Sequence, residues 1–192
     1  MEIHRIGIKL FAADPASIDL EAFVPVFHGW IQKQIVPGHL LVDVHNYSHI
    51  QDGPGILLVA HEGNFSMDKD QGQPGLFYYR KQPLNGSPEA RIAQVLKTAL
   101  NGASVLEDDP ALEGRVRFRT DELLVIGNDR LHIPNDEQTF SQIQPVVSGV
   151  MLRLLDGAGF KMSRVSTNPR ERFSIRVETG QAASAKTLLA RM

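Results

Sequence analysis

The chain has 192 residues and a formal net charge of −2, and 42% of its residues are hydrophobic and 22% charged, as in an ordinary globular domain. Because it has no cysteine, disulfides, thiolate zinc sites, iron–sulfur clusters and cysteine nucleophiles are excluded, and the composition fits a reducing compartment. No apolar run approaches the roughly 18 residues of a membrane span. We therefore expect a soluble, cytoplasmic protein with no membrane partner, and the slightly acidic balance disfavours nucleic acid.

The first half of the chain predicts a strand, a helix and a group of short strands. Residues 6–10 alternate at the period of a strand, and apolar residues between 20 and 31 recur at helical spacing. Pro25 lies inside the helical pattern and predicts a kink or a late helix start. Further strands are expected at residues 40–45, 56–61, 65–67 and 76–81. Their connections are too short for parallel crossovers, so the group resembles an antiparallel meander.

The second half opens with the clearest helix, which has Ser87 as its N-cap and Pro88 as its first residue. It ends in the acidic loop 107–113, the candidate boundary between two lobes. The pattern after this loop predicts a hairpin with a turn at Thr120 and Asp121. A helix with an interior proline, two strands and a short tail helix are then expected at 140–154, 160–162, 173–177 and 181–191.

This order predicts an α+β fold in which antiparallel, hairpin-connected strands are covered by three main helices. We expect one compact domain over residues 1–192. Both halves combine paired strands with a proline-containing helix, so the two lobes are candidate pseudo-repeats, although no residue-level identity establishes a duplication.

The stretch from His39 to Phe65 holds four of the seven histidines and is the first candidate for a chemical site. A divalent metal ion needs imidazole and carboxylate ligands from at least two backbone segments. The candidate metal ligands are Asp43, His45, His49 and His61. Their spacing matches no standard metal motif, and no other cofactor is predicted. The competing interpretation is that the aspartates bond turn amides while the histidines lie at the surface.

His61 and Glu62 end an apolar strand and form the candidate catalytic pair. Histidine titrates near neutrality, so it can act as a general base beside a carboxylate. A nucleophile is harder to name, because Ser48 and Ser66 do not lie in a G-x-S-x-G elbow. The sequence also lacks a glycine-rich phosphate loop. It therefore leaves open whether the protein is an enzyme.

Polar side chains at strand ends and in adjacent loops predict a cleft for a small polar or anionic ligand, because a sheet can hold such residues in fixed positions. The candidate ligand-binding residues are His49, Asp52, Arg80, Asn128, Asp129 and Arg130. The competing interpretation of the loop that contains the last three is that its polar groups only stabilise the loop and cap the next helix.

Two alternatives belong to other functional classes. One is a homo-oligomeric assembly module without catalysis, whose interface is formed by aromatic residues such as Trp30, Phe77 and Tyr79. The other is a nucleic-acid binder with a basic sheet face, which requires two arginine-bearing strands to be neighbours. The arginines concerned are Arg115, Arg117, Arg119, Arg172 and Arg176. A solvated face balanced by nearby glutamates is the competing interpretation.

Overall fold

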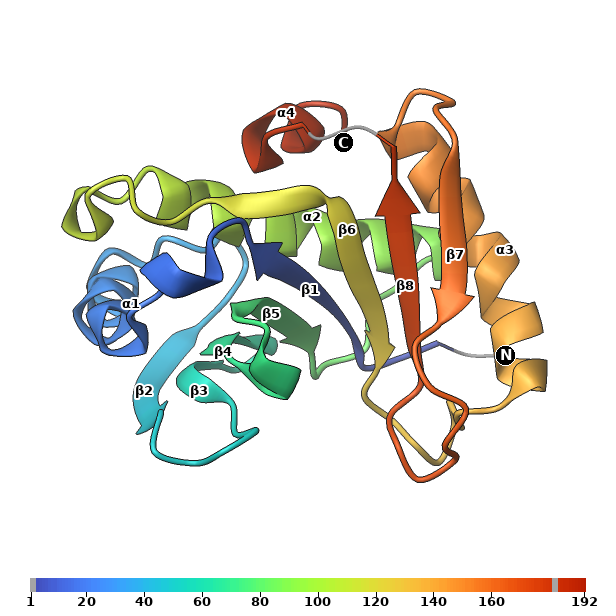
Figure 1. Ribbon diagram of the computed structural model, residues 1–192, viewed down its shortest axis with the longest axis horizontal. Coiled ribbons are helices and arrows are strands. Elements are labelled where there is room, and N and C mark those ends of the chain that lie inside the picture. Colours follow the sequence, from blue (N-terminus) through green and yellow to red (C-terminus); the bar gives the residue numbers. More distant parts are fainter. Residues whose placement is uncertain (1–2, 181–182) are drawn as a thin grey trace.

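The computed structural model describes residues 3–180 and 183–192, and these form an eight-stranded antiparallel sheet with helices packed on one face (Figure 1). The strands are β1 (Ile6–Ala12), β2 (Leu41–Tyr47), β3 (Gly55–Ala60), β4 (Gly63–Asp68), β5 (Gly75–Arg80), β6 (Phe118–Gly127), β7 (Phe160–Arg164) and β8 (Ser174–Thr179). The α-helices are α1 (Phe23–Lys33), α2 (Pro88–Glu107), α3 (Glu137–Leu154) and α4 (Ala185–Leu189). The predicted α+β class with an antiparallel sheet is therefore confirmed.

The strand order is β2-β3-β4-β5-β1-β6-β8-β7, so β1 and β6 pair at the centre of the sheet. The chain order β1-α1-β4-β5-α2 recurs as β6-α3-β7-β8-α4, and the hairpin β2-β3 is inserted in the first half alone. The neighbours β4-β5-β1 correspond to β7-β8-β6 across the central pair. The two halves thus share a topology, as expected for pseudo-repeated lobes.

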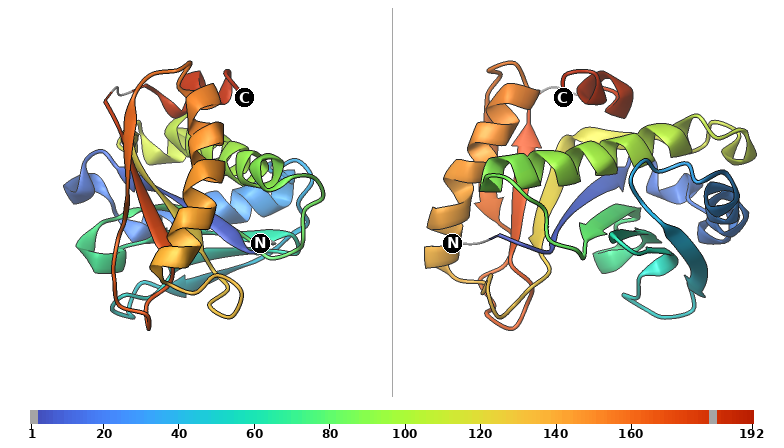
Figure 2. Two further views of the ribbon diagram at one scale, coloured as in Figure 1. Left: turned by 90° about the vertical axis from the view of Figure 1, so that its right-hand side faces the viewer. Right: turned by 180° about the vertical axis from the view of Figure 1, so that it is seen from behind.

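Cross-strand pairing places apolar residues on one face of the sheet and a mixture of polar and apolar residues on the other, because successive side chains of a strand point to opposite faces. One row of paired, buried positions consists of Leu58, Phe65, Tyr78, Ile8, Val125 and Ile175. The next row, on the other face, consists of His45, Leu57, Ser66, Phe77, Lys9, Leu124, Arg176 and Ser163. The helices cover the first face, which leaves the second face to the loops (Figures 1 and 2).

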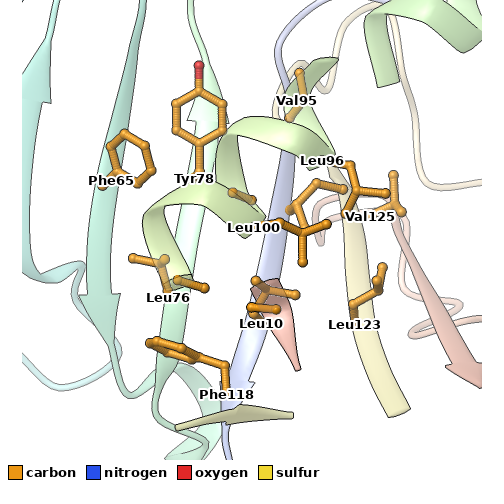
Figure 3. Close-up of a cluster of buried hydrophobic side chains, with 14 of the residues drawn as sticks. Leu10, Phe65, Leu76, Tyr78, Val95, Leu96, Leu100, Phe118, Leu123 and Val125 are labelled. Atoms are coloured by element: carbon orange, nitrogen blue, oxygen red, sulfur yellow. The ribbon is translucent and has the colours of Figure 1, made fainter. Parts of the chain in front are cut away.

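The core lies between the apolar face and the helices. α2 packs on β1 and β5, α1 packs on β2 and β3, and α3 packs beside α2 (Figure 2). Figure 3 shows Leu96 and Leu100 of α2 near Leu10 of β1. The helix approaches the sheet closely at Gly102, where a Cβ atom would lie 2.7 Å from Cε1 of Phe65. This close approach explains why a glycine is found inside a long helix.

The predicted starts of the first two helices agree with the structure, whereas α3 begins at Glu137 rather than at residue 140 and α4 begins at Ala185 rather than at residue 181. Residues 181–182 of the predicted tail helix lie outside the described residues. α1 begins at Phe23 after a 3₁₀ turn, so Pro25 falls in the first helical turn, where a missing N–H breaks no intrahelical bond. Ser87 caps α2 by accepting a hydrogen bond from the Ala90 N–H at 3.2 Å. Pro145 lies inside α3, as expected.

The predicted hairpin over residues 116–126 is wrong, because β6 runs without a turn from Phe118 to Gly127. The Thr120 hydroxyl donates to the carbonyl of Ala183 and accepts from the N–H of the same residue at 2.9 Å. Asp121 pairs with the Arg119 guanidinium at 3.0 Å. These contacts hold two residues with turn propensity in an extended strand.

The aromatic interface predicted for an oligomer is wrong for two of its three members. Trp30 is 1% exposed and Phe77 is 6% exposed, so both contribute to packing within the chain.

Among residues 3–180 and 183–192, none of the helices combines the length and apolar character that a membrane crossing requires.

Candidate functional site

The four candidate metal ligands do not converge. Asp43 and His45 lie on the exposed edge strand β2, with 3.5 Å between the carboxylate and the imidazole Nε2. His49 follows the end of β2, whereas the His61 N–H bonds to the Leu40 carbonyl at its start. A strand of this length spans roughly 20 Å. Within the described residues, no group of three or more His, Asp or Glu side chains could hold a metal ion.

The candidate catalytic pair lies at a structural turn. The Glu62 carboxylate accepts a hydrogen bond from the Leu40 N–H at 2.7 Å, and the Glu62 carbonyl accepts from the N–H groups of Lys81 and Gln82. Desolvation alone would raise the pKa of Glu62, but the Leu40 hydrogen bond and other favourable contacts hold that pKa below its usual value. His61 is exposed. The geometry ties the β3–β4 turn to the segment that precedes β2.

His39, which was not among the candidate residues, contacts the core. Its Nε2 lies 2.7 Å from the Tyr78 hydroxyl, and its Nδ1 lies 3.1 Å from the Pro37 carbonyl oxygen. A carbonyl only accepts, so Nδ1 carries the proton and Nε2 accepts from the tyrosine. Burial lowers the pKa of His39 and raises the pKa of Tyr78. The contacts of His39 with Tyr78 and Pro37 fix the loop before β2 to the core.

The helix-free face is hollowed between the β4–β5 loop (69–74) and the β7–β8 loop (165–173). This hollow, which we call the open-face cavity, has a volume of about 530 Å³. The central strands β1 and β6 contribute Lys9, Phe11, Leu124 and Ile126 to its lining. A smaller side cavity of about 300 Å³ shares Asp70, Asn128 and Arg172 with it. The two cavities are therefore adjacent, and together we call them the cleft.

Three of the six candidate ligand-binding residues line this cleft. Asn128 borders both cavities, Arg130 borders the open-face cavity and Asp52 borders the side cavity. The other three candidate residues, His49, Arg80 and Asp129, do not border either cavity. His49 lies in the exposed β2–β3 turn, the Arg80 guanidinium donates to the Gln82 carbonyl at 3.1 Å, and Asp129 accepts from the His132 imidazole at 3.0 Å.

The arginine-bearing strands β6 and β8 are neighbours, but the predicted basic face forms only in part. Arg172 and Arg176 line the open-face cavity. By contrast, Arg115 and Arg117 precede β6, and Arg119 pairs with Asp121 and Glu122. The strand pairing that a basic face requires is therefore present, but of the five arginines only Arg172 and Arg176 line the open-face cavity.

The open-face cavity has more basic than acidic side chains. Its basic residues are Lys9, Arg130, Arg170, Arg172 and Arg176, and its acidic residues are Asp70 and Glu171. Three bases have carboxylate partners: Lys9 with Asp68 at 2.6 Å, Arg172 with Asp70 at 3.6 Å and Arg176 with Glu122 at 3.1 Å. In the described part of the chain, Arg130 and Arg170 have no carboxylate at ion-pair distance.

The side cavity has the opposite balance. Asp52, Asp68 and Asp70 border it together with a single basic residue, Arg172. The anion-attracting part of the cleft is thus the open-face cavity.

Sequence reasoning missed Lys9 and Asp68. Lys9 alternates with apolar residues in its strand, a pattern that ordinarily places a lysine in solvent. Asp68 lies just beyond the strand predicted at residues 65–67, but in the structure it is the last residue of β4. Burial raises the pKa of Asp68, and the neighbouring Lys9 ammonium opposes that rise.

Comparison of the chain with protein-family models, curated proteins and solved structures finds no significant match.

Proposed function

We propose that this protein binds a small ligand with phosphate or carboxylate groups in the open-face cavity. The observation that carries the proposal is the pair of arginines, Arg130 and Arg170, that border the cavity without a carboxylate partner in the described part of the chain. A guanidinium matches the geometry of phosphate and carboxylate and can bind either through two hydrogen bonds. An anionic ligand would thus meet donors that are not already engaged.

The size and composition of the cavity support the same proposal. About 530 Å³ lies within the range of roughly 300–1,000 Å³ that is usual for small-molecule sites. Leu124 and Ile126 give the lining apolar area beside the charged groups, as such sites require. The ion pair between Arg172 and Asp70 links the β4–β5 loop to the β7–β8 loop.

Nucleic acid is a poorer candidate for this face. Single-stranded binding surfaces stack bases on exposed aromatic rings. Here Phe11 is 5% exposed, and the Arg172 guanidinium lies 5.7 Å from the ring centroid of the buried Phe77. These rings are therefore not available as a stacking surface.

Replacing both Arg130 and Arg170 with alanine is expected to weaken the binding of inorganic pyrophosphate or citrate roughly tenfold or more, because each loss removes charge-assisted hydrogen bonds. Isothermal titration calorimetry at low ionic strength measures this effect, and the two probes separate phosphate from carboxylate chemistry. Arg153→Ala is the matched control, since Arg153 is exposed on α3, the helix that packs beside α2 away from the cavity.

The control variant should bind like the wild type. Absence of binding to both probes by the wild-type protein, or equal affinity in the Arg130→Ala/Arg170→Ala variant, would contradict the proposed function.

A further inference from the structure

Lys9 and Asp68 form an ion pair at the base of the cleft. The Lys9 Nζ lies 2.6 Å from Asp68 Oδ1, and the two side chains are only 3% and 8% exposed. Lys9 borders the open-face cavity and Asp68 borders the side cavity. The pair therefore lies where the two cavities adjoin.

The backbone around this pair leaves room for it. Lys9 is paired with Phe77 across the β1–β5 ladder, whereas Asp68 is paired with Gly75 across the β4–β5 ladder. The lysine side chain must therefore pass Gly75 to reach the carboxylate. A Cβ atom at residue 75 would lie 3.2 Å from Lys9 Cε and 2.4 Å from the Leu10 carbonyl oxygen. Glycine permits this close approach.

Stability alone is a weak reason to bury these charges. Removing two charges from water costs several kcal/mol per ion, and replacing a buried ion pair by uncharged groups of similar volume is often neutral or stabilising. A buried pair next to a cavity is thus better explained by an interaction with what enters the cavity.

The hydrogen-bonding capacity of Lys9 is not exhausted by its partner. An ammonium has three N–H donors. In the described part of the chain, Asp68 Oδ1 is the hydrogen-bond acceptor for Nζ, and the same oxygen also accepts from the Asp70 N–H at 3.2 Å. Lys9 contributes to the cavity lining, and in the described part of the chain no second acceptor lies at hydrogen-bond distance from its Nζ.

We infer that Lys9 is a ligand-binding residue, whose ammonium is positioned by Asp68 and donates to an anionic oxygen of the ligand at the floor of the open-face cavity. This inference rests on the proposed function and narrows its ligand class. Arg130 and Arg170, which are exposed, bind one anionic group at the mouth of the cavity, and the buried Lys9 binds a second. The ligand is therefore a small molecule with two anionic groups, such as a diphosphate or a dicarboxylate.

The test is the double variant Lys9→Met/Asp68→Asn, which removes both charges, nearly preserves the side-chain volumes and keeps an oxygen for the Asp70 N–H. We expect its affinity for inorganic pyrophosphate or citrate to fall roughly tenfold or more. Its thermal unfolding midpoint should equal or exceed that of the wild type. Lys97→Met, which removes an exposed lysine on α2, is the control and should leave both quantities unchanged.

Unchanged affinity in the Lys9→Met/Asp68→Asn variant would overturn the inference, and so would a clearly lower unfolding midpoint, because the pair would then be structural. If this variant binds normally while the Arg130→Ala/Arg170→Ala variant does not, the proposed function stands and the role of Lys9 fails. If the wild type binds neither probe, both fail together.

Discussion

Replacing Lys9 alone with methionine is expected to lower the free energy of unfolding at pH 7 by about 3–5 kcal/mol, because it leaves the Asp68 carboxylate buried without a counterion. Chemical denaturation with urea, analysed by linear extrapolation, measures this loss. The single variant should therefore be far less stable than the Lys9→Met/Asp68→Asn double variant, although the latter carries one more substitution.

The stability loss in Lys9→Met should depend on pH. Burial already raises the pKa of Asp68, and loss of the Lys9 ammonium removes an interaction that lowers it. A carboxyl group whose pKa is higher in the folded than in the unfolded chain destabilises the fold above the folded-state pKa. That penalty is absent below the unfolded-state value of about 3.9. The stability difference from the wild type is therefore expected to shrink as the pH falls toward about 4.

Lys97→Met again serves as the control, since a surface substitution should change stability by no more than about 0.5 kcal/mol. If Lys9→Met lowers the free energy of unfolding by no more than about 0.5 kcal/mol, the Asp68 carboxylate does not need Lys9. The same conclusion follows if the variant loses more stability but the loss does not vary with pH.

Replacing Phe65 with alanine is expected to cost about 3–5 kcal/mol of unfolding free energy, because it removes a fully buried ring from the centre of the core. Phe65 is 0% exposed and lies 4.6 Å from Tyr78 and 5.6 Å from Trp30, measured between ring centroids. Gly102 of α2 packs against the same ring. The helix–sheet interface cannot close the resulting cavity without moving α2.

Thermal and urea unfolding of Phe65→Ala measure this effect. Leu131→Ala is the matched control, because Leu131 is 84% exposed and its loss should change stability by no more than about 0.5 kcal/mol. A loss below about 1 kcal/mol in Phe65→Ala would mean that the sheet and α2 are not packed as described.

Most elements could be predicted from the sequence because their signals are local. The apolar period places α2 and α3, and Ser87 and Pro88 mark the start of α2. The hairpin predicted at Thr120 failed because that residue is held extended by Ala183, more than sixty positions away in the chain. Turn propensity carries no information about such a partner. Strand order likewise depends on long-range pairing, which residue patterns do not encode.

The site could be predicted only in part, for the same reason. In the loop after β6, the predicted residues Asn128 and Arg130 border the open-face cavity, since polar residues that follow a buried strand lie at the edge of the sheet. The stretch from His39 to Phe65 was a candidate site because it is rich in histidine, yet its histidine side chains lie at opposite ends of β2. Lys9 and Asp68 are 59 residues apart, and their contact is determined by the register of β1, β5 and β4.

The most direct test of the central claim is a titration of the ¹⁵N-labelled wild-type protein with inorganic pyrophosphate, followed by two-dimensional ¹H–¹⁵N NMR. Binding in the open-face cavity predicts that the largest shifts occur at the backbone amides of Leu124, Ile126 and residues 170–176, with little change at Asp43 and His45 on the far edge of the sheet. Shifts concentrated on β2 and the β3–β4 turn, or no shifts at any residue with either pyrophosphate or citrate, would contradict it.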